Sequence, residues 1–141
     1  MIKKYFFILL AIVCFASCQT SNKIIKTKIP SRPKGQTHVL GLTTPKIDTV
    51  RIGIIGLGMR GISAVERFIH IPGVEIKALC DIRGELCQRA EQTLLNAGKE
   101  KPTSYYGDEQ LWKKVCERED IDLIYVVTDW ENHENIGVYA M

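Results

Sequence analysis

The sequence has few of the residues from which metal sites and disulfide frameworks are built. It contains three histidines and five cysteines in 141 residues, and none of the cysteines shows Cys-x-x-Cys spacing. Cys14 and Cys18 fall in an N-terminal leader, which leaves Cys80, Cys87 and Cys116 for the rest of the chain. An odd number of cysteines without paired spacing predicts neither a disulfide framework nor a zinc site.

The sequence also lacks an apolar run long enough to cross a membrane as a helix. Its longest, residues 5–16, follows two lysines and is shorter than the ~20 residues that a spanning helix needs. A basic start, a short apolar core and the small residues Ala16 and Ser17 before Cys18 resemble a bacterial lipoprotein signal. We therefore expect residues 1–17 to be removed, and Cys18 to carry the lipid of an exported, membrane-anchored protein at the periplasmic or outer-membrane face. An ordinary signal peptide cut nearby is the alternative.

Strong basic charge is missing from the part of the chain that has the composition of a folded domain. The whole sequence has a formal net charge of +3. The leader contributes two lysines and residues 18–49 a net +5, which leaves −4 for residues 50–141. We expect no nucleic-acid partner, because an acidic domain without a basic stripe binds nucleic acid poorly. Residues 18–49 show no hydrophobic period and read as a flexible basic linker after the lipidated cysteine.

A glycine-rich turn stands between an apolar strand and a helix. Residues 50–55 form an apolar, β-branched run that is typical of a buried parallel strand. The run leads directly into Gly56-x-Gly58-x-x-Gly61, and the residues behind the turn have helical spacing. Strand, glycine turn and helix form the context of a dinucleotide-binding fingerprint, in which a pyrophosphate lies at the helix N-terminus.

An acidic residue follows the next strand at the position that this fingerprint requires. Residues 74–80 predict a second strand, and Asp81 stands at its carboxyl end, twenty residues past Gly61. A carboxylate there accepts hydrogen bonds from the adenosine ribose and favours NAD over NADP, although Arg83 partly offsets its charge. The alternative is that Asp81 only caps the following helix.

The remaining segments alternate between helix and strand, which predicts parallel strands joined by right-handed crossovers. Helices are expected over 62–70, 84–97, 109–118 with Asp108 as N-cap, and from a cap at Asp129 or Asn132 to Met141, and strands over 103–106 and 121–128. We predict an α/β fold over residues 50–141, a Rossmann-like parallel sheet of about four strands with helices on both faces. The polar cluster 128–133 then lies beside the first strand, where it either faces the nicotinamide half of a dinucleotide or caps a helix.

These motifs together resemble the N-terminal domain of the Gfo/Idh/MocA oxidoreductases. Segments 51–58, 78–81 and Thr128-x-x-x-x-His133 carry this resemblance. More narrowly, the chain resembles glycoside hydrolase family 109, whose members are exported bacterial α-N-acetylgalactosaminidases that use NAD. The segments that resemble this family are 58–61, 64–67, 112–114, 120–123 and 138–141. The chain departs from the family at Asp129, where proline is usual.

The resemblance implies NAD as cofactor and a sugar or glycoside as substrate. The sugar is oxidised at C3, loses its aglycone by elimination, takes up water and is reduced again. The cofactor-binding residues that the resemblance implies are Gly56, Leu57, Gly58, Met59, Arg60, Gly61, Asp81, Thr128, Trp130 and His133. Catalytic residues and a second α/β domain are expected beyond Met141, so we expect a truncated and inactive chain. The alternatives are an exported sugar dehydrogenase of the same fold and a non-catalytic NAD- or sugar-binding lipoprotein.

Overall fold

The computed structural model describes residues 31, 34–35, 40–41 and 43–141. The chain divides into the units Met1–Leu42 and Thr43–Met141, and all the helices and strands given below belong to the second unit. The predicted signal peptide and Cys18 lie outside the described residues. Within the described ranges, no helix has both the length and the apolar character needed to cross a membrane.

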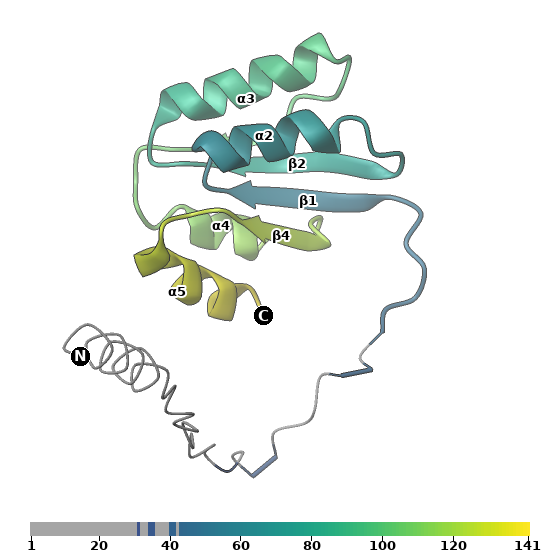
Figure 1. Ribbon diagram of the computed structural model, residues 1–141, viewed down its shortest axis with the longest axis vertical. Coiled ribbons are helices and arrows are strands. Elements are labelled where there is room, and N and C mark those ends of the chain that lie inside the picture. Colours follow the sequence, from purple (N-terminus) through teal and green to yellow (C-terminus); the bar gives the residue numbers. More distant parts are fainter. Residues whose placement is uncertain (1–30, 32–33, 36–39, 42) are drawn as a thin grey trace, which may run out of the picture. The chain divides into compact units, whose positions relative to one another are not determined.

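The second unit alternates strand and helix along the chain (Figure 1). The elements are β1 Val50–Ile55, α2 Met59–Phe68, β2 Val74–Cys80, α3 Gly84–Asn96, β3 Thr103–Tyr105, α4 Trp112–Cys116, β4 Leu123–Val126 and α5 Trp130–Ala140. The strands form one sheet in the order β3-β2-β1-β4, and every neighbouring pair is parallel. The chain therefore runs outward from β1 to β3 and then crosses back to place β4 on the other side of β1. This arrangement confirms the predicted Rossmann-like fold.

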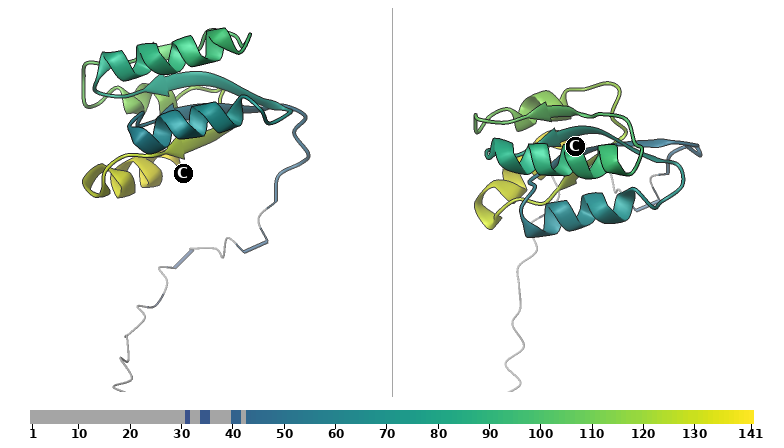
Figure 2. Two further views of the ribbon diagram at one scale, coloured as in Figure 1. Left: turned by 45° about the horizontal axis from the view of Figure 1, so that its top comes forward. Right: turned by 90° about the horizontal axis from the view of Figure 1, so that it is seen from above.

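The strands are apolar because both faces of the sheet are covered. On one face, β1 and β2 pack against α2 and α3, which run side by side (Figure 2). The core of this face consists of Ile52, Ile54, Leu57, Ile62, Val65, Ile76, Leu79, Cys87, Ala90 and Leu94. The other face packs against α4 and α5 through Ile55, Ala78, Cys80, Val115 and Ile136. Gly53 lets α4 approach β1, since a Cβ there would lie 2.7 Å from Val115 Cγ1.

The observed elements differ from the predicted ones mainly at their ends. The glycine motif itself begins α2, because the Ile62 amide donates to the Gly58 carbonyl at 3.0 Å. The predicted helix over 109–118 is shorter than expected, and the prediction of Asp108 as its N-cap is wrong. The Asp108 carboxylate instead accepts from the Gln110 amide at 2.7 Å, which forms a turn before the helix begins. The cap of α5 is confirmed at Asp129.

The amino ends of β1 and β4 are joined by an ion pair. Arg51 donates to both carboxylate oxygens of Asp122, from Nε at 2.8 Å and from Nη2 at 2.7 Å. The Arg51 amide adds a bond of 2.9 Å to the same carboxylate. These hydrogen bonds lower the pKa of Asp122 to about 2. The pair therefore helps to fix the register of β4 on β1 at the end of the sheet opposite the glycine turn.

Candidate functional site

A cavity of about 820 Å³ lies at the carboxyl ends of the strands, and we call it the carboxyl-edge cavity. Its walls come from the glycine turn after β1, the segment after β2, the segment before and at the start of α4, and the loop from β4 into α5. In open parallel sheets, ligands bind at this edge, where neighbouring connections run to opposite sides. In this sheet that point lies between β1 and β4.

Two of the three motif glycines are required because backbone segments approach one another closely. Gly56 has a φ of +94°, and a Cβ there would lie 2.7 Å from the carbonyl carbon of Val127 and overlap its oxygen. The turn after β1 thus packs directly on the backbone that follows β4. A Cβ on Gly61 would lie 2.9 Å from the carbonyl carbon of Gly56 and overlap its oxygen. The start of α2 therefore packs directly against the turn, as the fingerprint predicts.

Gly58 differs from the other two glycines because it faces open space. The nearest atom to a Cβ placed there would be Arg83 Nη2, at 3.8 Å. Gly58 is the N-cap residue of α2, no side chain caps that helix, and its first turn holds no acidic residue. Met59 and Arg60 of this first turn line the cavity. An uncapped helix N-terminus with a cation beside it is suited to an anionic ligand.

Asp81 joins the end of β2 to the glycine turn. Its carboxylate is 8% exposed, and Oδ2 accepts from the Leu57 amide at 2.7 Å. Oδ1 accepts from the amide and the Nε of Arg83, at 3.0 and 3.2 Å. No side chain caps α3, so the alternative prediction that Asp81 only caps this helix is wrong. A carboxylate offers about four acceptor positions, which leaves room for a ribose hydroxyl.

The loop after β4 brings Thr128 to the cavity. Thr128 lines the wall, and its Oγ1 is buried without a hydrogen-bond partner in the described part of the chain. A buried hydroxyl without a partner costs roughly 1–3 kcal/mol, so a ligand atom that bonds to it gains that energy. The neighbouring Asp129 accepts from the Asn132 amide at 2.9 Å, and this bond holds the pKa of Asp129 below its usual range.

The ten residues that the resemblance implies as cofactor contacts occupy three kinds of position. Those that line the cavity are Gly56, Gly58, Met59, Arg60, Asp81 and Thr128. Leu57 and Gly61 are buried behind the wall and hold the turn in place. Trp130 is 99% exposed and His133 is also exposed, and neither belongs to the wall. A role for these last two residues stays a prediction.

Several wall residues were not among the predicted contacts. They are Ile55, Cys80, Ile82, Arg83, Asp108, Glu109, Gln110, Trp112, Val127, Asp129, Glu131, Asn132 and Ile136. Arg83 had a local signal, since it follows Asp81 by two positions. Trp112 had none, because its apolar spacing also fits a residue that only packs. It does pack, edge-on against Tyr139 at 5.1 Å, while it lines the cavity.

The polar groups around the cavity are suited to binding a ligand, and the cysteine in its wall is a poor nucleophile. Burial raises the pKa of the Cys80 thiol to about 12, so this wall residue is protonated and a poor nucleophile at neutral pH. Over residues 43–141 and the few described before them, no three His, Cys, Asp or Glu side chains are grouped to hold a metal ion. The cavity wall instead offers backbone amides, two arginines, a carboxylate with one acceptor position left, and Thr128, whose hydroxyl has no partner in the described residues.

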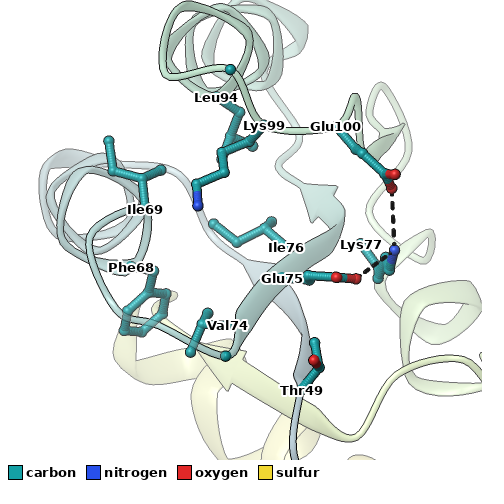
Figure 3. A pocket seen from close by; sticks show the side chains of 12 residues that line it. Thr49, Phe68, Ile69, Val74, Glu75, Ile76, Lys77, Leu94, Lys99 and Glu100 are labelled. Carbon is teal, nitrogen blue, oxygen red and sulfur yellow. Dashed lines mark hydrogen bonds and ion pairs between the residues drawn. The ribbon is translucent and has the colours of Figure 1, made fainter.

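A second, smaller hollow of about 330 Å³ lies at the opposite end of the sheet, between the ends of α2 and α3 and the start of β2 (Figure 3). We call it the amino-edge hollow. Its apolar residues are Phe68, Ile69, Val74, Ile76 and Leu94. On its rim, Lys77 pairs with Glu75 at 2.7 Å and with Glu100 at 3.3 Å. Lys99 reaches into it from the end of α3.

No protein-family model matches the chain. The chain is 50% identical over 145 residues to glycosyl hydrolase family 109 protein 1 of Phocaeicola vulgatus, which covers 96% of this chain and 31% of that protein. It is 57% identical over 117 residues to a glycosyl hydrolase family 109 protein of Porphyromonas gingivalis, covering 83% and 25%. The predicted resemblance to family 109 is confirmed. The chain spans about a third or less of the length of these family 109 relatives.

Solved structures support the same fold. The chain is similar to myo-inositol dehydrogenase from Lactobacillus casei, solved with NAD(H) and myo-inositol, with 27% identity and a TM-score of 0.53. That match covers 65% of this chain and 25% of the dehydrogenase. A 3-ketoreductase from Actinomadura kijaniata, solved with TDP-benzene and NADP, has 22% identity and a TM-score of 0.50 over 65% and 26% of the two chains, and supports the fold alone.

Proposed function

We propose that residues 50–141 form the NAD-binding part of a protein of the glycosyl hydrolase family 109 type. One observation carries the proposal: the uncapped N-terminus of α2, Asp81 at the end of β2 and Thr128, whose buried hydroxyl has no partner in the described part of the chain, all line one cavity. The first two are the places at which a dinucleotide needs an anion site and a ribose acceptor, and Thr128 lies on the β4 side of the switch point. When bound, NAD supplies a hydride acceptor for a substrate.

Different wall residues would contact different parts of the cofactor. The diphosphate lies at Gly58 and the first turn of α2, where no Cβ intervenes and where Arg60 and Arg83 supply positive charge. The adenosine ribose lies at Asp81, whose carboxylate keeps one acceptor position free of the three donors it already has. The nicotinamide half then falls on the β4 side, at Thr128. Calorimetric titration of the chain with NAD should give saturable binding, and the absence of any heat or thermal stabilisation would contradict the proposal.

The cofactor is NAD rather than NADP in this proposal, because Asp81 places a negative charge where the 2′-phosphate of NADP would lie. Its ion pair with Arg83 at 3.2 Å reduces that charge, so the preference is expected to be modest. Titrations with both cofactors test it, and Asp81→Asn should narrow the difference. Tighter binding of NADP to the unaltered chain would reverse the assignment.

For the whole protein, we propose an NAD-dependent glycosidase of the α-N-acetylgalactosaminidase type that oxidises, eliminates, hydrates and re-reduces its sugar. The family name of the relatives supports this activity. The described wall contains no histidine, and we place the acid–base residues outside this chain. The chain alone should therefore release no p-nitrophenol from a p-nitrophenyl glycoside. NAD-dependent turnover by the purified chain would contradict this part of the proposal.

A sugar dehydrogenase of the same fold is the second candidate, and the likeness to a myo-inositol dehydrogenase favours it. The two activities differ in their cofactor balance. A glycosidase that returns its hydride releases the aglycone without net NADH, whereas a dehydrogenase accumulates NADH without releasing the aglycone. Measuring aglycone release and net NADH formation with the full-length parent protein separates the two candidates.

We further propose that the protein is exported and held at a membrane through lipid on Cys18. The support is the basic, apolar and small-residue pattern of residues 1–18. Cys18→Ala should release the protein from membranes. Cys14→Ala, within the apolar core of the signal, is the matched control and should leave it attached. A Cys18→Ala protein that still pellets with membranes after a high-salt wash would contradict the anchor.

A further inference from the structure

Charged side chains are distributed unevenly around the carboxyl-edge cavity. The side formed by the glycine turn and the segment after β2 carries Arg60 and Arg83, with Asp81 paired to Arg83. The segment before α4 adds Asp108 and Glu109. The side formed by the loop from β4 into α5 carries Asp129 and Glu131 and no cationic wall residue. A ligand that spans the cavity therefore meets both arginines of the wall at one end, and among charged groups only carboxylates at the other.

The negative end is built into the start of α5. Asp129 is held by the cap it forms, with Oδ1 accepting from the Asn132 amide at 2.9 Å and from its Nδ2 at 3.1 Å. Glu131 is exposed in the first turn, and its carboxylate has no ion pair with a cation of the described residues. A helix N-terminus contributes roughly half a positive charge, which two carboxylates more than offset.

The two ends of the cavity correspond to the two halves of the proposed cofactor. With the diphosphate at α2 and the adenosine ribose at Asp81, the nicotinamide ring falls on the β4 side, near Asp129. The oxidised ring carries a positive charge and the reduced ring is neutral, whereas the rest of the molecule is the same in both. Charges at this end therefore act on the difference between the two redox states.

We infer that Asp129 and Glu131 make the cavity bind oxidised NAD more tightly than reduced NADH. This inference rests on the proposed function. Unit charges about 6 Å apart at an exposed protein site interact strongly enough to change an affinity by about 3- to 10-fold. For a two-electron couple a tenfold preference for the oxidised form lowers the potential of the bound cofactor by about 30 mV. The cavity then holds its cofactor in the form that accepts a hydride.

The test measures the affinities of NAD, NADH and ADP-ribose for the full chain and its variants by calorimetry at low salt. Asp129→Asn removes the charge but keeps a side chain that caps helices well. Glu131→Gln removes the second charge without touching the cap. Glu134→Gln makes the same change of charge on α5 away from the cavity wall and is the matched control. ADP-ribose shares everything with NAD except the nicotinamide.

The expected result is tighter binding of NAD than of NADH, with the ratio falling about 3- to 10-fold in Asp129→Asn and further in the double variant. The affinity for ADP-ribose should stay the same in every variant, and Glu134→Gln should leave the ratio unchanged. An NADH affinity equal to or greater than that of NAD in the unaltered chain, or a ratio that survives both substitutions, overturns the inference. Failure of all three ligands to bind would instead overturn the proposed function.

Discussion

The two ends of the sheet differ in the bonding of their polar groups. At the amino-edge hollow, Lys77 is paired with two carboxylates and the floor is apolar. At the same end of the sheet, the Arg51 guanidinium donates hydrogen bonds to both carboxylate oxygens of Asp122. At the carboxyl-edge cavity, among the residues that the structure describes, the N-terminus of α2 has no side-chain cap and the Thr128 hydroxyl has no partner. At the amino end of the sheet, these charged side chains are paired within the chain. At the carboxyl end, hydrogen-bonding groups remain without a partner in the described residues.

The hydrogen bonding of the polar groups distinguishes a packing feature from a binding site better than the size or the apolar character of a hollow does. The amino-edge hollow is the gap between the ends of two helices, which Lys99 reaches from α3 (Figure 3). Long cationic side chains commonly cover apolar surface in this way while their charge stays in water. Unpaired buried groups are costly, so each needs an explanation, and for Thr128 we propose a ligand. The predictions below test whether the two ends are independent.

The largest effect is expected from Gly61→Ala. The added Cβ would overlap the Gly56 carbonyl oxygen, and neither backbone segment has room to move. We expect a loss of at least ~3 kcal/mol in the free energy of unfolding and no detectable NAD binding. Gly137→Ala is the matched control, because nothing lies within 4 Å of a Cβ there and the position is helical. That variant should gain up to about 1 kcal/mol and bind NAD normally. Urea unfolding and calorimetry measure both quantities.

Leu94→Ala should affect stability but not binding. Leu94 is 2% exposed and belongs to both the core under α3 and the amino-edge hollow. Removing its side chain should cost about 2–4 kcal/mol in the free energy of unfolding. The affinity of the folded fraction for NAD should remain within about twofold of the original, since the cavity wall is untouched. A parallel loss of affinity in titrations below the unfolding transition would show that the two ends are coupled.

Thr128→Val should affect NAD binding but not lower stability. It removes the buried hydroxyl that has no partner and keeps the shape of the side chain. Stability should stay the same or rise by up to about 1 kcal/mol, while the affinity for NAD falls about 3- to 10-fold. Thr49→Val, at the rim of the amino-edge hollow, is the matched control and should change neither quantity. An unchanged affinity in Thr128→Val would remove this hydroxyl from the site.

The smallest effect is expected from Asp122→Asn, and it depends on pH. The pKa of Asp122 is about 2 in the folded chain, below its ordinary value of 3.8, so ionisation of this group favours the folded state above that value. The contribution is complete above about pH 4 and disappears as the pH falls toward 2. The difference in unfolding free energy between the unaltered chain and Asp122→Asn should shrink over the same range. NAD binding at neutral pH should be the same in both.

Local patterns were sufficient to predict most of the fold. The β-branched run before Gly56 and the spacing of the glycines identified β1, the turn and α2, because each depends on neighbours in sequence. The alternation of the later segments gave the parallel sheet and placed β4 beside β1. The start of α4 was missed because the Asp108 carboxylate bonds to Gln110, two residues on, instead of capping a helix. Sequence alone does not decide between these two uses of an aspartate.

The candidate site was less predictable, because its walls come from segments that only the folded chain brings together. The Leu57 amide reaches the Asp81 carboxylate across 24 positions of the sequence. That bond makes Asp81 a support of the glycine turn, in addition to the ribose acceptor that we propose it to be. Trp112 enters the wall from α4, whose apolar spacing indicates packing and nothing more. The glycines were predictable because their role depends on backbone geometry rather than on partners.

The most direct test of the account is amide hydrogen exchange along the chain with and without saturating NAD. We expect protection in the turn and first helical turn at 56–62, in the segment 81–83 and in the loop 127–133, where the three parts of the wall meet. Segments 68–77 and 94–100, which surround the amino-edge hollow, should exchange at the same rate in both conditions. Protection confined to the amino-edge segments, or none anywhere at a concentration that saturates binding, would contradict the account.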